Sequence, residues 1–238
     1  MAFDLEEQEK IDELKAWWNR FGGLVSGVAT VIMLAILGYY GWNWYQGYQS
    51  QKALGYYDII NTSVMVPEQS SAARIIEANG VLQKDYGSTV YAPRAALLAS
   101  KFFLDMDNAA EAEKQLQWAV TQKTDPSLVP AAQLQLATAL ADQEKYDQAL
   151  AQLTNPPAAF KALFLDRQGD ILIAQGKAAD AVKAWQEAKA AAGLDDSLVR
   201  TVDLKISVLG GESKHGKIDE STLFKSRSSI KLICLRTF

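Results

Sequence analysis

The chain has 238 residues, of which 49% are hydrophobic and 22% are charged, and its formal net charge is −4. Residues 53–211 carry 14 Lys and Arg against 19 Asp and Glu, a difference of −5, which argues against a nucleic-acid partner because such proteins present a basic patch. One cysteine, Cys234, and one histidine, His215, exclude an intramolecular disulfide and a Cys/His cluster with zinc-ligand spacing.

The first predicted element is a membrane anchor over residues 21–45. No charged side chain occurs between Arg20 and Lys52, and residues 24–40 read LVSGVATVIMLAILGYY. A helix needs about 20 mostly apolar residues to cross a bilayer core about 30 Å thick. Aromatic residues, which prefer the two membrane interfaces, flank this segment at both ends. They are Trp17, Trp18 and Phe21 before it, and Tyr39, Tyr40, Trp42, Trp44, Tyr45 and Tyr48 after its centre.

An apolar segment near an N-terminus can also be the core helix of a soluble protein or a cleaved secretion signal. A soluble core helix rarely runs this long without a charge. A cleaved secretion signal has a basic start, an apolar run of about 7–15 residues and a small-residue cleavage site. Here the first twenty residues are acidic overall, and bulky aromatic residues follow the apolar run. We therefore expect the anchor to stay attached.

Positive charges near the helix ends predict its orientation. Lys10, Lys15 and Arg20 precede the segment, whereas only Lys52 follows it closely. This places residues 1–20 in the cytoplasm and the long C-terminal part on the other side of the membrane. Within the anchor, Gly23 and Gly27 are spaced as in a G-x-x-x-G contact between transmembrane helices.

The region after the anchor, residues 46–211, is predicted to be an all-α domain. It is alanine-rich, and its apolar residues recur at three- and four-residue spacing, as in amphipathic helices. Turn residues divide it into stretches of ordinary helix length. These breaks fall at Pro67, Gly87, Asp107-Asn108, Asp125-Pro126, residues 142–145, Pro156-Pro157, Gly176 and Gly193.

Three segments of this region superpose when one alanine in each is aligned. The alanines are 37 and 32 residues apart (149 minus 112, and 181 minus 149). In each segment an apolar residue lies four positions later, a small residue twelve positions earlier and a large apolar residue nine positions earlier. These positions hold Ser100, Phe103, Ala112 and Leu116; Ala137, Leu140, Ala149 and Leu153; and Gly169, Leu172, Ala181 and Trp185.

This pattern resembles the tetratricopeptide repeat, whose unit of 34 residues is a helix–turn–helix. The resemblance implies that the small residue and the alanine let the two helices of a unit approach closely. Two departures occur: Pro156-Pro157 must end the second helix of the middle unit early, and Gln168 stands where leucine is usual. A generic alanine-rich bundle that aligns by chance is the alternative.

Further helices are expected at both ends of the three units. Residues 53–61 and 71–86 form a degenerate fourth pair that leads in from the membrane. A last helix near residues 196–209 carries Leu198, Val202, Ile206 and Leu209 on one stripe. We expect it to cover the apolar end of the stack, as terminal repeats must.

The resemblance also implies a concave protein-binding face formed by the first helix of each unit. A mixed apolar and acidic face with only two basic residues suits weak contact with extended polypeptide better than a carboxylate clamp. We expect about half of its leucines to be core residues instead. The candidates are Arg94, Leu97, Lys101, Leu104, Leu134, Thr138, Asp142, Leu163, Asp166, Asp170 and Ile173.

Over residues 1–209 the order of parts resembles the YfgM family. The most specific similarity is the last unit, with Asp166, Gly169, Asp170, Gly176, Lys177, Ala181, Ala184 and Trp185. The resemblance implies an ancillary subunit of the SecYEG translocon in a bacterial inner membrane, with a periplasmic domain. It also implies the membrane-anchored chaperone PpiD and secreted polypeptides as partners, and a link to envelope-stress signalling. A structural scaffold for a division or cell-wall complex is the alternative function.

Residues 212–238 depart from that family and are predicted to be disordered or translated out of frame. They contain His215, which a Ser-His-Asp or Cys-His arrangement would have to use. No P-loop, no G-x-G-x-x-G after a strand and no H-E-x-x-H motif occurs. A carboxylate pair is the catalytic arrangement that the sequence leaves open. We expect a protein that is not an enzyme and has no cofactor or metal.

Overall fold

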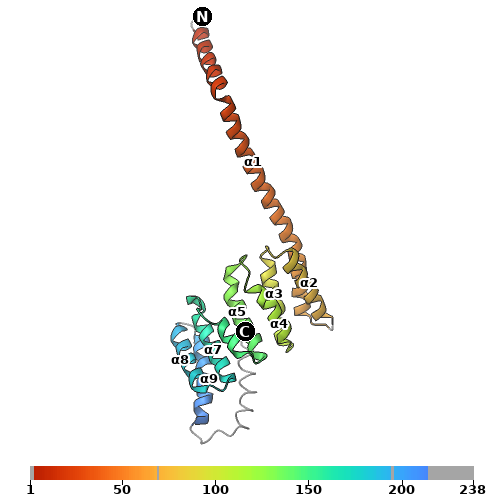
Figure 1. Ribbon diagram of the computed structural model, residues 1–238, viewed down its shortest axis with the longest axis vertical. Helices are drawn as coiled ribbons and strands as arrows, with labels where there is room; N and C mark the ends of the chain where they lie inside the picture. The colour runs from red at the N-terminus through yellow and green to blue at the C-terminus, as the bar shows by residue number, and fades with distance from the viewer. Residues whose placement is uncertain (1–2, 69, 194–195, 214–238) are drawn as a thin grey trace. The chain divides into compact units, whose positions relative to one another are not determined.

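The computed structural model describes residues 3–68, 70–193 and 196–213, and the regular structure in these ranges is entirely helical (Figure 1). The all-α prediction is therefore confirmed. The predicted tail lies outside the described residues, except for residues 212 and 213, which end the last helix. The helices are α1 (Phe3–Met65), α2 (Ser71–Asp85), α3 (Tyr91–Asp105), α4 (Ala109–Ala119), α5 (Val129–Asp142), α6 (Tyr146–Gln152), α7 (Lys161–Ala174), α8 (Ala178–Ala191) and α9 (Asp196–Ser213), with 3₁₀ turns at Pro126–Leu128 and Ala158–Phe160.

The chain divides into two compact units, residues 1–52 and 53–238, and the first consists of most of α1. Among the described residues, α1 is the one helix long and apolar enough to cross a bilayer. Only 6% of its most apolar window is buried, whereas the core helix of a soluble protein would be covered by its own chain. The Thr30 hydroxyl donates to the Ser26 carbonyl oxygen at 2.8 Å, so this polar group is satisfied within the helix.

The second unit begins with the last turns of α1, where Ala53 and Ile60 are fully buried in the core. The helix predicted near residues 53–61 is thus the end of α1 and not a separate element. No proline occurs before Pro67, and a glycine such as Gly55 costs an α-helix only about 1 kcal/mol. The predicted boundaries at residues 20 and 45 fall inside α1 and stay predictions.

The helices that follow are arranged in pairs. Helix α3 packs against α4, α5 against α6, and α7 against α8. The first helix of each pair also contacts the first helix of the next, so that α3 lies beside α5 and α5 beside α7. This is the stacking of a tetratricopeptide-like repeat.

The turn inside each of these three pairs has the same backbone geometry. In each turn the second residue after the end of the first helix has a positive φ. The residue that follows it donates its N–H to the carbonyl oxygen of the large apolar repeat residue. This is a Schellman motif, which satisfies the last carbonyls of a helix. The positive φ values are 56° at Asp107, 60° at Glu144 and 81° at Gly176. The bonds run from Asn108 to Phe103 (2.8 Å), from Lys145 to Leu140 (2.9 Å) and from Lys177 to Leu172 (2.9 Å).

Of these three turns, only the third has glycine at the position with positive φ. The same position in the second turn holds Glu144, and its substitution has a predictable effect. We expect Glu144→Gly to raise the free energy of unfolding by about 1 kcal/mol, because a side chain with a Cβ is strained at this φ. Gly176→Ala should lower it by a similar amount. Thermal unfolding followed by circular dichroism measures both. Equal melting temperatures for Glu144→Gly and the parent chain would contradict the prediction.

The small repeat residues are buried inside the helix pairs. Ser100, Ala137 and Gly169 are buried, and so are the three aligned alanines. Helix α8 approaches α7 so closely at Gly169 that an added Cβ would lie 2.3 Å from Nε1 of Trp185. The Trp185 ring is fully buried, and its Nε1 donates to the backbone oxygen of Asp166 at 3.1 Å.

The middle unit departs from the repeat in the way its sequence predicts. Helix α6 has only seven residues and ends before Pro156-Pro157. The Gln168 side chain donates to the carbonyl oxygen of Leu153, the residue at the end of α6, at 3.0 Å. Gln168 therefore stabilises the shortened helix by satisfying one of its terminal carbonyls, which accounts for a polar residue at this position.

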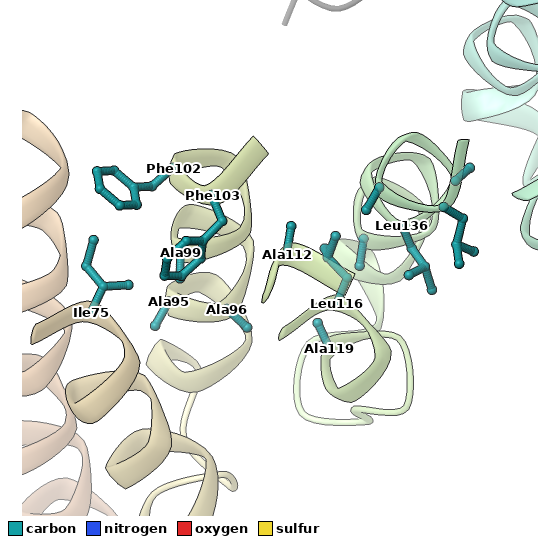
Figure 2. Close-up of a cluster of buried hydrophobic side chains, with 14 of the residues drawn as sticks. Ile75, Ala95, Ala96, Ala99, Phe102, Phe103, Ala112, Leu116, Ala119 and Leu136 are labelled. Atoms are coloured by element: carbon teal, nitrogen blue, oxygen red, sulfur yellow. The ribbon is translucent and has the colours of Figure 1, made fainter. Parts of the chain in front are cut away.

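The buried side chains form two clusters. The larger runs from the end of α1 to α7, and Figure 2 shows its part between α2 and α5, with Ile75 and Phe102 between α2 and α3. The smaller cluster centres on Trp185 and includes Leu198 and Val202 of α9. Helix α9 thus packs over the last pair, as predicted for a capping helix.

Candidate protein-binding face

The candidate binding face consists of the residues predicted on α3, α5 and α7, and its most exposed part lies on α3. Arg94 and Lys101 are exposed there, whereas Leu97 and Leu104 are half-buried against the larger core cluster. The Arg94 guanidinium lies 3.2 Å from the Asp125 carboxylate. A hydrogen bond from the Ser127 hydroxyl, followed by the one from Arg94, holds the pKa of Asp125 below its ordinary value.

The residues on α5 are largely covered. Leu134 is half-buried against the core, and Asp142 is half-buried at the end of the helix. Thr138 is only 9% exposed, and its hydroxyl donates to the Leu134 carbonyl oxygen at 3.0 Å. The Gln135 side chain of α5 reaches α3, where its Oε1 accepts a hydrogen bond of 2.6 Å from the Ser100 hydroxyl. This bond fixes α3 against α5.

The residues on α7 are covered by α9. The Lys205 ammonium of α9 lies 2.8 and 2.9 Å from the two carboxylate oxygens of Asp166, and 2.8 Å from Oδ1 of Asp170. The side chains of Lys205, Asp166 and Asp170 are 4%, 8% and 8% exposed. Ile173, like Leu163, is half-buried in the Trp185 cluster. These residues therefore form an interface inside the domain, because α9 packs over them.

The structure thus separates the candidate residues into two groups. Arg94, Lys101 and the edges of three leucines on α3 and α5 remain accessible, while the α7 residues hold the capping helix. The sequence predicts that about half of the leucines are core residues, and all three on α3 and α5 pack against the core in part. The accessible part of the candidate binding face therefore lies over α3 and α5.

Sequence reasoning missed two residues that decide this arrangement. Asp125 precedes a proline at a turn, and nothing in the sequence pairs it with Arg94. Lys205 stands beside Ile206 within the apolar stripe of α9, and a charge in such a stripe is the available signal. In the predicted membrane anchor, an added Cβ at Gly23 or Gly27 would have no neighbour within 4 Å, so the helix contact predicted there stays a prediction.

The buried acidic group predicts a pH effect. Burial, followed by the nearby charge of Asp170, raises the pKa of Asp166, and this outweighs the opposing effects of Lys205 and Arg167. The folded protein therefore binds a proton at Asp166 more tightly than the unfolded chain does. The stability that this group contributes is fully present when the pH is below the ordinary pKa of 3.8, and it is lost as the pH rises through the raised pKa of the folded state.

We accordingly expect the stability of the parent chain relative to Asp166→Asn to increase as the pH is lowered from about 7 to 4. Thermal unfolding at a series of pH values measures this difference. Asp180→Asn, which removes an exposed carboxylate of α8, is the matched control for the loss of one negative charge. A difference that shrinks on acidification would contradict the prediction.

Comparisons with known proteins agree with this architecture. Residues 15–211 match the family described as "Tetratricopeptide repeat-like domain". An "Ancillary SecYEG translocon subunit" of Neisseria gonorrhoeae is 31% identical over 192 residues, which cover 79% of this chain and 90% of the relative. The chain belongs to the YfgM family. Proteins with the same name from Haemophilus influenzae (29% identity, 79% of this chain and 91% of the relative) and Aggregatibacter actinomycetemcomitans (27%, 84% and 97%) are also similar. No solved structure matches the chain.

Several residues that carry the YfgM resemblance have structural tasks in the last pair. Gly169 makes room for the indole of Trp185, and Gly176 takes the left-handed turn conformation. Asp166 accepts the indole N–H through its backbone and the Lys205 ammonium through its carboxylate. In this YfgM chain these residues of the last unit thus fix a helix pair and its cap.

Proposed function

We propose that this chain is a membrane-anchored, chaperone-like adaptor of the SecYEG translocon. The observation that carries the proposal is the likeness to three proteins named ancillary SecYEG translocon subunits, each covered by 90% or more of its length. The single apolar helix and the stacked helix pairs suit an anchored protein that works through protein–protein contacts. On this proposal the protein is not an enzyme.

The proposed location is the bacterial inner membrane, with the N-terminus in the cytoplasm and the repeat domain in the periplasm. Lys10, Lys15 and Arg20 before the anchor, against Lys52 after it, support this orientation. The exposed apolar side chains of α1 would then face lipid, or another membrane helix along Gly23 and Gly27. The partners in this location would be the translocon and a PpiD-type anchored chaperone.

The proposed client surface is the accessible part of the candidate binding face, over α3 and α5. Lys101 is exposed there, beside the half-buried side chains of Leu97 and Leu104. A surface of partly exposed apolar side chains with few fixed charges suits brief contact with many unfolded secreted chains. It does not suit tight recognition of one carboxylate, because Arg94 is already paired with Asp125.

Site-specific photocrosslinking in cells tests this function. A photoreactive residue in place of Lys101 should form adducts with many secreted polypeptides, because Lys101 lies on the accessible α3 surface. Lys183 on α8 is the matched control, since its side chain is 75% exposed but lies on the second helix of a pair. One stable adduct at position 101 would favour a scaffold of another envelope complex, and equal client adducts at both positions would contradict the proposed surface.

A further inference from the structure

Helix α9 is attached to the repeat stack by a small apolar contact. Its fully or nearly buried apolar side chains are Val202 and Leu198, and Ile206 and Leu209 are partly buried beside them. The other side of α9 is exposed, with Arg200, Asp203 and Leu204 at the surface. This contact belongs to the Trp185 cluster, which has fewer buried side chains than the core cluster that runs from the end of α1 to α7.

A buried ion cluster completes the attachment of α9. Among the described residues, Lys205 is the one buried lysine or arginine. Its ammonium lies between the carboxylates of Asp166 and Asp170, and 5.7 Å from the centre of the Trp185 ring. Burying such a group is close to neutral in free energy when the charges are well paired, but strongly unfavourable when one partner is missing. The cluster therefore adds little net stability and makes docking conditional on a cation at this one point.

We propose that α9 is a releasable cap, and that the surface beneath it also binds an amphipathic helix of a partner protein with one lysine or arginine within its apolar stripe. α9 itself shows what this surface accepts: apolar residues at positions 198, 202, 206 and 209, with the cation at 205. A helix without the cation would leave the two buried carboxylates without the ammonium that lies between them, so the surface discriminates against purely apolar segments. This property belongs to α7, α8 and α9 alone and does not depend on the proposed function.

Hydrogen exchange of the full-length chain in detergent gives the first test and needs no variant. If α9 is releasable, the amides of residues 198–207 should exchange at least tenfold faster than those of α8, because α9 opens without the rest of the stack. The same exchange rates in α8 and α9 would mean that the cap leaves only on global unfolding, and would overturn the proposal.

Binding in trans gives the second test. The probe is a fluorescein-labelled synthetic peptide with the sequence of residues 196–213, and the full-length Lys205→Met chain, whose own cap is weakened, is the receptor. The peptide should bind at least tenfold more tightly than the same peptide with methionine at the lysine position, because the loss of one partner of a buried ion pair costs about 3–5 kcal/mol, or more than about a hundredfold in affinity. When the receptor also carries Asp166→Asn and Asp170→Asn, the preference for the lysine peptide over the methionine peptide should disappear.

A peptide that binds equally well with lysine or methionine would overturn the proposed selectivity, and so would a preference that survives removal of both carboxylates. Lys189→Met is the matched receptor control. It removes an exposed lysine that bridges to Asp203 of α9 at 2.6 Å, with the same change in charge. Its peptide binding should match that of the parent chain, because an exposed bridge contributes little.

Discussion

Gly169→Ala should lower the free energy of unfolding of the repeat domain by about 2–3 kcal/mol. The new Cβ would lie 2.3, 2.4 and 2.8 Å from Nε1, Cδ1 and Cε2 of Trp185, where ordinary contacts are 3.4 Å or longer. The indole cannot easily move away, because it is fully buried and hydrogen-bonded to the Asp166 carbonyl oxygen. Alanine's better helix propensity returns about 1 kcal/mol, which is less than the cost of the clash.

Thermal unfolding of the full-length chain in detergent, followed by circular dichroism, measures this effect. Gly80→Ala is the matched control, because Gly80 is also inside a helix but an added Cβ there meets nothing within 4 Å. That substitution should leave stability unchanged or raise it by up to about 1 kcal/mol. If both variants were equally stable, the close approach of α7 and α8 at Gly169 would be wrong.

Lys205→Met should weaken the docking of α9 by about 3–5 kcal/mol, the largest effect that we predict. Methionine matches the apolar length of lysine but leaves two buried carboxylates without the ammonium between them. The exposed Lys189–Asp203 bridge should contribute less than about 1 kcal/mol after screening by solvent, so Lys189→Met should have little effect. Hydrogen exchange of the α9 amides measures docking in both variants.

A compensating variant separates the charge from the packing. Adding Asp166→Asn and Asp170→Asn to Lys205→Met removes the buried charges altogether, and we expect it to recover most of the lost docking. The same exchange rates in the single and triple variants would show that the loss came from packing around Trp185 and not from uncompensated charge. A single variant with parental exchange rates would show that the ion cluster does not control the docking of α9.

Much of the repeat domain is predictable from the sequence because its contacts join neighbours along the chain. The turns at Asp107, Glu144 and Gly176 are 37 and 32 residues apart, the same spacing as the aligned alanines, so one local pattern sets both the turn and the helix contact. Pro156-Pro157 shortens α6 for an equally local reason, since proline cannot continue a helix. The role of Gln168 was not predictable, because it depends on where α6 ends in space.

The sequence by itself determined the long apolar helix, the all-α class, the helix pairs and the small residues between them, because hydrophobic periodicity and turn residues act over a few positions. Only the tertiary structure decided which side of each first helix is covered. Asp166 and Asp170 have the spacing of an accessible helix face, yet Lys205, 39 and 35 residues later, covers them. The physical reason is that burial depends on how the next helix crosses, and periodicity within one helix carries no information about that crossing.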